Sequence, residues 1–512
     1  MKTKSYLLPL FVIILAITTA CNSKTSQKES PKTIEQVMLS DSTSFYYLNV
    51  ANSVSTNASL PIGVFDSGTG GLTVLDELVN FDGYNNDKHS IGKDGKPDFE
   101  KEKFIYLADQ ANMPYGNYYA TNKSDLLVEH ILKDAQFLLS NKYYADELAK
   151  AYNTDKESVK AIVIACNTAT AYGKDSIVSL LNKAGLNIPV IGVIDAGAKG
   201  ALDVFTKDEN GSIGVFATVG TIASKGYENT IKRLVKDLGY TGTIQIYNQG
   251  GHGVAEVVDE EPDYIDRTAA IPRDSYRGPS LNHESYKIDP SLLDVYSFDF
   301  NNGKMLYEKN TANEYTKLQI NSADNYIRYH LVELMEQLRK AKAQPLKTII
   351  LGCTHYPYLL NEINSKLNEL YSYRKDGEYY YHDVMSKNIQ LINPAENVAK
   401  ELYAYLNDNT LFSTNNSIKE SEFYISVPNK DNKNITTDEH GRFTYEYKYG
   451  RNANEIQEYV KVTPFCRLNV QKEVLKRLEK LIPNTFALIV EFSQHNQKFA
   501  NIPNENKINF AD

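Results

Sequence analysis

The stretch PIGVFDSGTGGL at residues 61–72 decides the fold. Its first five residues are apolar, as in a strand that is buried on both faces, and they lead into a glycine-rich turn. Apolar residues then recur at helical spacing from Leu72 to Leu78. A buried strand, a tight turn and an amphipathic helix in this order predict the opening unit of an α/β protein with a parallel sheet.

Three further stretches of the chain repeat this pattern of strand and turn. They read AIVIACNTA (161–169), SIGVFATVGT (212–221) and TIILGCTHYP (348–357). The sequence IGVF occurs at both 62–65 and 213–216, and each copy is followed downstream by a strand that ends in a cysteine. The repeat predicts two similar α/β domains whose parallel central sheets face each other across a cleft.

The length of 512 residues also predicts more than one domain. A polar stretch at about 255–320 is far longer than an ordinary connection, so we expect an insertion there. A helix is expected over 470–481, after the repeated units. The expected order is a leader at 1–20, a flexible tether at 21–59, a first domain at 60–190 completed by 390–428, a second domain at 191–389, and a C-terminal extension at 429–512.

The first 21 residues have the layout of a bacterial export signal. Lys2 and Lys4 precede an apolar run, small residues occupy 18–20, and Cys21 follows them. This order is typical of a secretory leader, and it resembles the motif in which the cysteine receives a lipid. Plain secretion with an incidental Cys21 is the alternative. We expect an envelope protein that is anchored to the membrane through Cys21 and faces the periplasm or the exterior.

The charge balance excludes one large class of function. The chain has 55 Lys and Arg against 64 Asp and Glu, which gives a net charge of −9. Without a basic surplus we expect no nucleic-acid partner, because binding to phosphates needs clustered cations. Four cysteines in a chain of this length also exclude a disulfide scaffold.

Cys166 and Cys353 each stand where a predicted parallel strand ends. Ligands of such sheets bind beyond this edge, so two facing domains would bring both thiols to one cleft. A pair of acid/base groups on opposite sides of a carbon acid can remove a proton from one face and return one to the other. The result is the opposite stereoisomer, so the two thiols predict a racemase.

Three other roles are open for these cysteines. A cysteine at a strand end is often a small buried apolar residue. A disulfide between Cys166 and Cys353 is a second alternative, and export makes it more plausible than it is in the cytosol. A metal site is the weakest, since no second His or Cys stands at ligand spacing beside either residue. We therefore expect no metal.

Four motifs in their order along the chain carry a resemblance to a known family. They are FDSGTGGL (65–72), PYG (114–116), ACNTA (165–169) and LGCTHYP (351–357). Together they resemble glutamate racemase of the aspartate/glutamate racemase superfamily. The resemblance implies a two-base mechanism without a cofactor, a free amino acid (glutamate) as substrate, a role in supplying the D-amino acid of cell-wall peptidoglycan, and a homodimer as one form of assembly.

The resemblance also implies roles for single residues. Cys166 and Cys353 would be the two acid/bases, with Asp66 assisting the first and His355 the second. Contacts to the substrate's amino and carboxylate groups would come from residues that offer hydroxyl, amide, carboxylate or backbone groups, which suit a zwitterion. They are Asp66, Ser67, Tyr115, Gly116, Asn167, Thr168 and Thr354. Capping or turn formation is the alternative for Ser67, Thr168 and Thr354.

One position departs from the family pattern. Val219 stands where a Glu is common, and a valine can neither ionise nor hydrogen-bond. This departure leaves two alternatives to a glutamate racemase. One is a racemase of aspartate or another amino acid, and the other is a ligand-binding lipoprotein that has kept the cleft without turnover.

Overall fold

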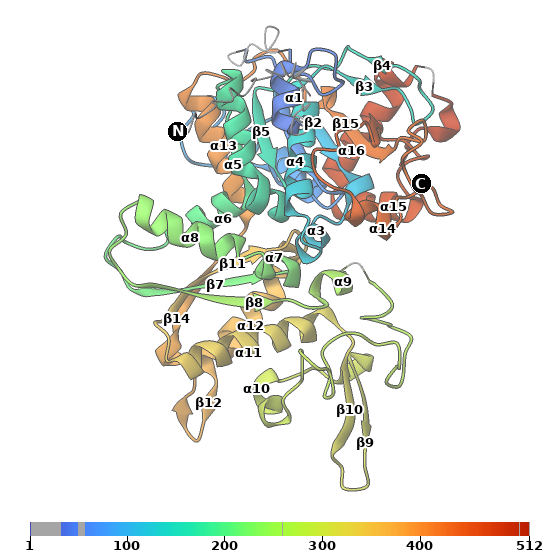
Figure 1. Ribbon diagram of the computed structural model, residues 1–512. Coiled ribbons are helices and arrows are strands. Elements are labelled where there is room, and N and C mark those ends of the chain that lie inside the picture. Colours follow the sequence, from blue (N-terminus) through green and yellow to red (C-terminus); the bar gives the residue numbers. More distant parts are fainter. Residues whose placement is uncertain (2–31, 50–56, 259, 501, 511–512) are drawn as a thin grey trace.

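The computed structural model describes residues 1, 32–49, 57–258, 260–500 and 502–510 (Figure 1). The expected leader beyond Met1, and Cys21 with it, lie outside the described residues. Among the residues that the structure describes, no helix has the length and apolar character needed to cross a membrane.

The first sheet is parallel except at one edge. Its strand order is β16-β15-β2-β1-β5-β6, and only β16 runs antiparallel to its neighbour. The residues of β1 and β5 are buried on both faces, as the apolar runs predict. The strands are β1 (Ile62–Asp66), β2 (Phe104–Ala108), β5 (Ala161–Ile164), β6 (Val190–Gly192), β15 (Glu422–Pro428) and β16 (Val460–Pro464).

The second sheet is parallel throughout and has the order β14-β11-β7-β8. Its strands are β7 (Gly211–Ala217), β8 (Ile244–Gly250), β11 (Leu346–Gly352) and β14 (Met385–Ile392). In Figure 1 this sheet lies below the first one, with helix α7 (Val219–Ala223) near the boundary. The prediction of an α/β fold with two parallel sheets is confirmed.

Helices cover both faces of each sheet. In the second sheet, Ile213 and Val215 pack with α6 (Val193–Leu202) and α8 (Gly226–Asp237). Phe216 and Leu351 belong to a separate core with α11 (Ala323–Ala341) and α12 (Leu360–Ser372). The first sheet forms one core with α2 (Leu72–Asn80), α4 (Ser124–Leu139), α5 (Asn167–Ala184), α13 (Pro394–Asp408) and α16 (Pro483–His495).

The C-terminal extension is part of the first domain. Strand β16 pairs with β15 at the edge of the first sheet, and Phe465, Leu478 and Phe486 belong to the same core as β1. Helix α15 (Lys472–Leu481) occupies the segment where a helix is expected over 470–481. The extension therefore widens the first sheet instead of forming a unit of its own.

The prediction of a flexible tether over 21–59 is wrong for residues 32–49. Helix α1 (Ile34–Ser40) begins with a capping box between Thr33 and Gln36. Ile34, Val37 and Met38 lie on one helical face and are buried in the core of the first domain. The polar composition of the segment concealed this short apolar stripe, which gains enough from burial to order the chain.

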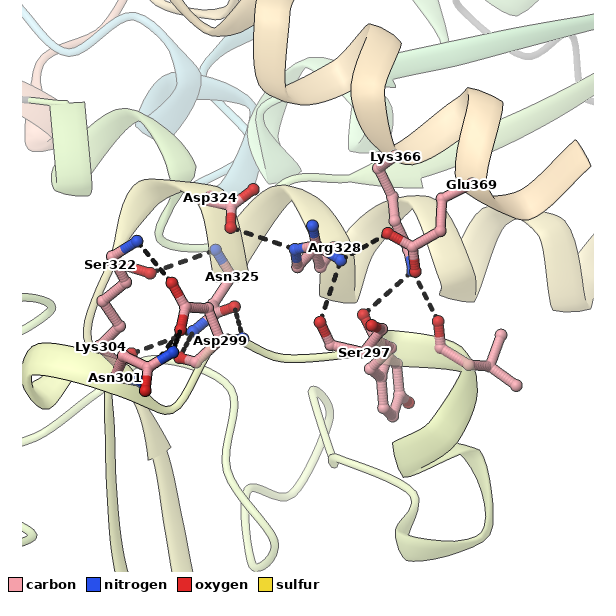
Figure 2. A network of polar contacts seen from close by, with 12 residues as sticks. Ser297, Asp299, Asn301, Lys304, Ser322, Asp324, Asn325, Arg328, Lys366 and Glu369 are labelled. Atoms are coloured by element: carbon pink, nitrogen blue, oxygen red, sulfur yellow. Dashed lines mark hydrogen bonds and ion pairs between the residues drawn. The ribbon is translucent and has the colours of Figure 1, made fainter. Parts of the chain in front are cut away.

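The insertion at 255–320 is held against α11 and α12 by a network of polar contacts (Figure 2). Lys366 of α12 is 0% exposed and donates to the carbonyls of Val295 and Tyr296 at the end of α10 (Leu293–Tyr296). Its third partner is Glu369, which also binds Arg328 of α11. Burial lowers the pKa of Lys366 to about 8, while Glu369 opposes that shift.

We expect Lys366→Met to loosen the insertion. The substitution keeps the buried stem but leaves the carbonyls of Val295 and Tyr296 without a donor, and each such loss costs about 1–3 kcal/mol. Hydrogen exchange should rise in 293–304 and the unfolding midpoint should fall. Lys387→Met, at an exposed position of β14, is the matched control and should change neither. Unaltered exchange in the Lys366 variant would show that the network does not hold the insertion.

Candidate active site

The turns after β1, β5, β7 and β11 lie at the carboxyl ends of their strands. In the first sheet Phe65 pairs with Ile164, so the turn at Asp66 and the turn at Cys166 are neighbours. In the second sheet Ala217 pairs with both Gly250 and Gly352, which aligns the ends of three strands. Each predicted cysteine therefore sits at the edge of its sheet where ligands bind.

Asp66 is held by the glycine-rich turn that follows it. Its Oδ2 accepts hydrogen bonds from the backbone N–H of Gly71 at 2.8 Å and of Gly68 at 3.3 Å. A side chain at position 71 would overlap Asp66, so the glycine is needed for this close approach. Burial raises the pKa of the Asp66 carboxyl, against the effect of these donors and of the Cys166 thiol, which hydrogen-bonds to it.

Cys166 caps the N-terminus of α5. Its Sγ accepts the backbone N–H of Ala169 at 3.4 Å and lies 3.9 Å from the hydroxyl oxygen of Ser67. The side chain is only 7% exposed. Burial, followed by the charge of Asp66, raises the pKa of the Cys166 thiol well above its usual range. Burial and the neighbouring carboxyl group therefore favour the thiol form of Cys166 over the thiolate.

Cys353 has a different neighbour. Its Sγ lies 3.6 Å from Nδ1 of His355, and the same nitrogen lies 3.4 Å from the hydroxyl oxygen of Thr354. Cys353 is also 7% exposed, whereas Thr354 and His355 are half-buried. A histidine at this distance can exchange a proton with the thiol. The structure thus places a titratable side chain beside each cysteine, Asp66 beside Cys166 and His355 beside Cys353.

Asn167 connects the two cysteine-bearing turns directly. Its Nδ2 donates to the carbonyl of Gly352 at 3.2 Å, and its Oδ1 accepts from the hydroxyl of Tyr227 at 3.2 Å. Asn167 adjoins Cys166 in the chain, and Gly352 adjoins Cys353. Burial is the main cause that raises the pKa of Tyr227, and the charge of Cys353 is the second. This phenol therefore keeps its proton and donates it to Asn167.

A cavity of about 120 Å³ opens between the two domains beside this bridge. Volumes of this order hold small organic molecules in proteins. Cys353, Thr354 and Asn167 line the cavity together with Tyr227, whereas Cys166 and Asp66 do not. Asp76 and Glu77 of α2 and Asn393 and Pro394 before and in α13 close its other side.

Tyr115 and Gly116 lie at the start of helix α3 (Gly116–Ala120). Tyr115 is predicted to contact the substrate, and the surroundings of its hydroxyl limit how it could do so. The hydroxyl is buried and bonded to the carboxyl groups of Asp109 and Asp134. Tyr115 can therefore reach a ligand only through its ring or its backbone, while Gly116 has open space where a side chain would be.

Sequence reasoning missed Tyr227, which reaches the site from α8. No motif surrounds it, and only the packing of α8 beside β11 shows its role. Thr168 lies in the first turn of α5, and Val219 is exposed at the start of α7.

Cys166, Cys353 and Cys466 are all free thiols, so the structure does not contain the alternative Cys166–Cys353 disulfide. In the described ranges no group of three His, Cys, Asp or Glu residues could hold a metal ion.

Comparison with known proteins finds glutamate racemases among the relatives of this chain. No family model matches the chain. The chain is 28% identical over 339 residues to the glutamate racemase of Sulfurihydrogenibium sp. (strain YO3AOP1). The matched region covers 66% of this chain and 83% of the relative. It is 26% identical over 374 residues to the glutamate racemase of Thermoanaerobacter pseudethanolicus (73% and 90%). Over 171 residues it is 37% identical to the glutamate racemase of Enterococcus faecalis (33% and 46%).

Solved structures of glutamate racemases are also similar to this chain. One is the isoform RacE1 from Bacillus anthracis, with 24% identity, 72% of this chain and 88% of that chain covered, and a TM-score of 0.38. Another is the enzyme from Francisella tularensis in complex with D-glutamate, with 21% identity, 77% and 95% covered, and a TM-score of 0.38. The chain is therefore similar, over about two thirds to three quarters of its length, to curated glutamate racemases.

Proposed function

We propose that this protein is an amino-acid racemase that interconverts L- and D-glutamate without a cofactor, with Cys166 and Cys353 as the two acid/bases. The observation that carries the proposal is the bond between Asn167 and Gly352, because it brings the two cysteine-bearing turns of opposite domains together. The curated relatives, which are glutamate racemases, support the same reaction.

In the proposed reaction one sulfur starts as a thiolate and the other as a thiol. The thiolate takes the α-proton, so the C–H bond breaks and an S–H bond forms while the α-carbon becomes planar. The opposite thiol then gives its proton to the other face of that carbon. One proton is taken and one is returned, so no oxidant, reductant or other reactant is consumed.

Asp66 and His355 would exchange protons with the neighbouring thiols and so return each sulfur to its starting protonation state. Burial raises the pKa of the Asp66 carboxyl, so this group can accept the proton of Cys166 and return it. His355 has the same role for Cys353 across 3.6 Å. Ser67, Asn167, Thr168, Thr354 and the backbone at Gly116 would bind the amino and carboxylate groups of the substrate.

We also propose that the protein is lipid-anchored through Cys21 in the bacterial cell envelope. The order of charged, apolar and small residues before Cys21 supports this placement. In that location the enzyme would act on amino acids released from or destined for the cell wall. Sizing of the purified protein tests the expected homodimer.

Purified protein in heavy water should incorporate deuterium at the α-carbon of L- or D-glutamate and invert it without pyridoxal phosphate. Mass spectrometry and chiral chromatography measure both events, with a reductant present to keep the thiols free. Faster exchange with L-aspartate would assign aspartate as the substrate. Binding without exchange of any amino acid would contradict the racemase proposal and leave a ligand-binding protein.

Changing Cys166 or Cys353 singly to Ala should lower the rate of inversion by about 10²–10⁴, the usual contribution of a positioned acid/base group. Cys466→Ala is the matched control, because Cys466 is also a buried free thiol but lies in the core of the first domain. Full activity in either single variant would contradict the two-thiol assignment.

Asp66→Asn should lower kcat/KM equally in both directions, because two enantiomers have the same free energy and their equilibrium constant is one. The amide cannot accept the proton of Cys166, so proton removal by this thiol should become slower. The isotope effect with α-deuterated substrate should therefore rise for one enantiomer only. Equal isotope effects in both directions would show that Asp66 does not serve Cys166 specifically.

Cys21→Ala should release the protein from the membrane fraction, since the substitution removes the atom that would carry the lipid. Fractionation of expressing cells, followed by immunoblotting, measures the distribution. Cys466→Ala should stay with the membranes. Membrane association of the Cys21 variant equal to that of the unaltered protein would contradict lipidation.

A further inference from the structure

A second cluster of polar side chains lies away from the thiols, beyond the carboxyl end of β2. The hydroxyl oxygen of Tyr115 is 2.6 Å from Oδ2 of Asp109 and 2.6 Å from Oδ2 of Asp134. The three residues are 1%, 2% and 5% exposed, in that order. Two carboxyl groups thus share one hydroxyl group in the interior of the first domain.

The number of protons in this cluster follows from its geometry. A phenol has a single proton and can donate it to one carboxylate only. The second contact is as short as the first, so it needs a proton of its own; otherwise two sets of lone pairs would face each other at 2.6 Å. One of the two carboxyl groups must therefore be protonated.

The surroundings identify which carboxyl group carries that proton. Asp109 also accepts from the hydroxyl of Ser426 at 2.6 Å and from the amide of Asn112 at 3.0 and 3.1 Å. Several donors stabilise a carboxylate in its charged form. Within the described part of the chain, Tyr115 is the only group that hydrogen-bonds to the carboxyl of Asp134. The proton belongs on Asp134.

The charges around Asp134 favour the same assignment. Burial raises the pKa of Asp134 well above its usual range, the charge of Asp109 adds to the shift, and Asp66 contributes further. Lys133 opposes it, but Glu129 on the same helix forms an ion pair with that lysine. Asp109 and Asp134 line a small cavity together with His130 and with Arg451 of the C-terminal extension. Burial lowers the pKa of His130, which favours its neutral form.

The cluster is joined to the candidate active site through the backbone. The N–H of Asp109 donates to the carbonyl of Asp66 at 2.9 Å. A side chain on Gly68 would overlap Met113, so the segment before Tyr115 lies against the turn that holds Asp66. On its other side the cluster reaches β15 through Ser426, and the amide of Asn112 accepts from Arg451 at 2.8 Å.

We propose that Asp134 is a neutral carboxylic acid in the folded protein and acts as a positioning residue. It donates its proton to the oxygen of Tyr115, and Tyr115 donates its own to the carboxylate of Asp109. This chain of two hydrogen bonds fixes Tyr115, and with it the start of α3 at Gly116, beside the turn of Asp66. The effect on turnover rests on the proposed racemase function, whereas the protonation state does not.

A neutral Asp134 makes the stability of the folded protein depend on pH. A carboxyl group whose pKa is higher in the folded than in the unfolded chain contributes stability that is complete at low pH and is lost as the pH rises through the folded value. Above that value two carboxylates would share one hydroxyl and repel each other. Stability should therefore fall with rising pH, starting above the usual pKa of an aspartate, about 4.

Asp134→Asn is the decisive variant, because an amide keeps a neutral donor of the same shape toward Tyr115. Asp109→Asn removes the charged acceptor instead, and Asp125→Asn removes an exposed charge from the same helix as a control. Infrared difference spectra at neutral pH should show the carbonyl band of a protonated acid that Asp134→Asn removes and Asp125→Asn keeps. The unfolding midpoint of Asp134→Asn should lack the decline with pH that the unaltered protein shows.

Activity gives a second comparison with an expected order. Asp134→Leu, which removes the donor to Tyr115, and Asp109→Asn should each lower kcat/KM about tenfold to a hundredfold through displacement of the Tyr115 segment. Asp134→Asn, which restores a neutral donor, should recover most of the loss seen in Asp134→Leu. A protonated-acid band that survives in Asp134→Asn but disappears in Asp109→Asn would place the proton on Asp109 and overturn the proposal. The infrared and unfolding data need no substrate, so they stand even if the protein proves not to be a racemase.

Discussion

The amide of Asn167 donates a hydrogen bond of 3.2 Å to the carbonyl of Gly352, and this bond spans the boundary between the two sheets. Each partner is the chain neighbour of a cysteine, so one bond determines how closely the two thiol-bearing turns approach. Tyr227 holds the other end of the amide and thereby sets its orientation. The proposed two-base reaction needs both thiols within reach of one carbon, and this contact joins the turns that carry them.

Burial governs the chemistry of the site on the side of Cys166. It raises the pKa of both the Cys166 thiol and the Asp66 carboxyl, because both charged forms are disfavoured away from water. The same effect acts on Asp134 behind the Tyr115 segment. Among the described residues, neither the C-terminal extension nor the insertion lines the cavity beside Cys353. The C-terminal extension widens the first sheet, and the insertion is fastened to α11 and α12 through Lys366 and Arg328.

Much of the fold could be predicted from local pattern. The apolar runs at 62–65 and 348–351 form buried parallel strands, and the repeat of IGVF marks the opening strand of each sheet. The tether prediction was wrong at 32–49 because three apolar residues in a polar segment are enough for a packed helix. The hydroxyl of Tyr115 could not be placed from its motif, since its partners Asp109 and Asp134 come from different elements.

The sequence by itself determined the strands, the turns after them and the residue types in those turns, because these depend on apolar runs, glycine positions and chain neighbours. Only the tertiary structure decided that Asn167 meets Gly352, that Tyr227 joins them, and that Asp134 shares a proton chain with Tyr115 and Asp109. Each of these contacts joins segments that different helices and strands bring together. Burial and distance then set the proton affinity of each group, and neither quantity can be read from the order of residues.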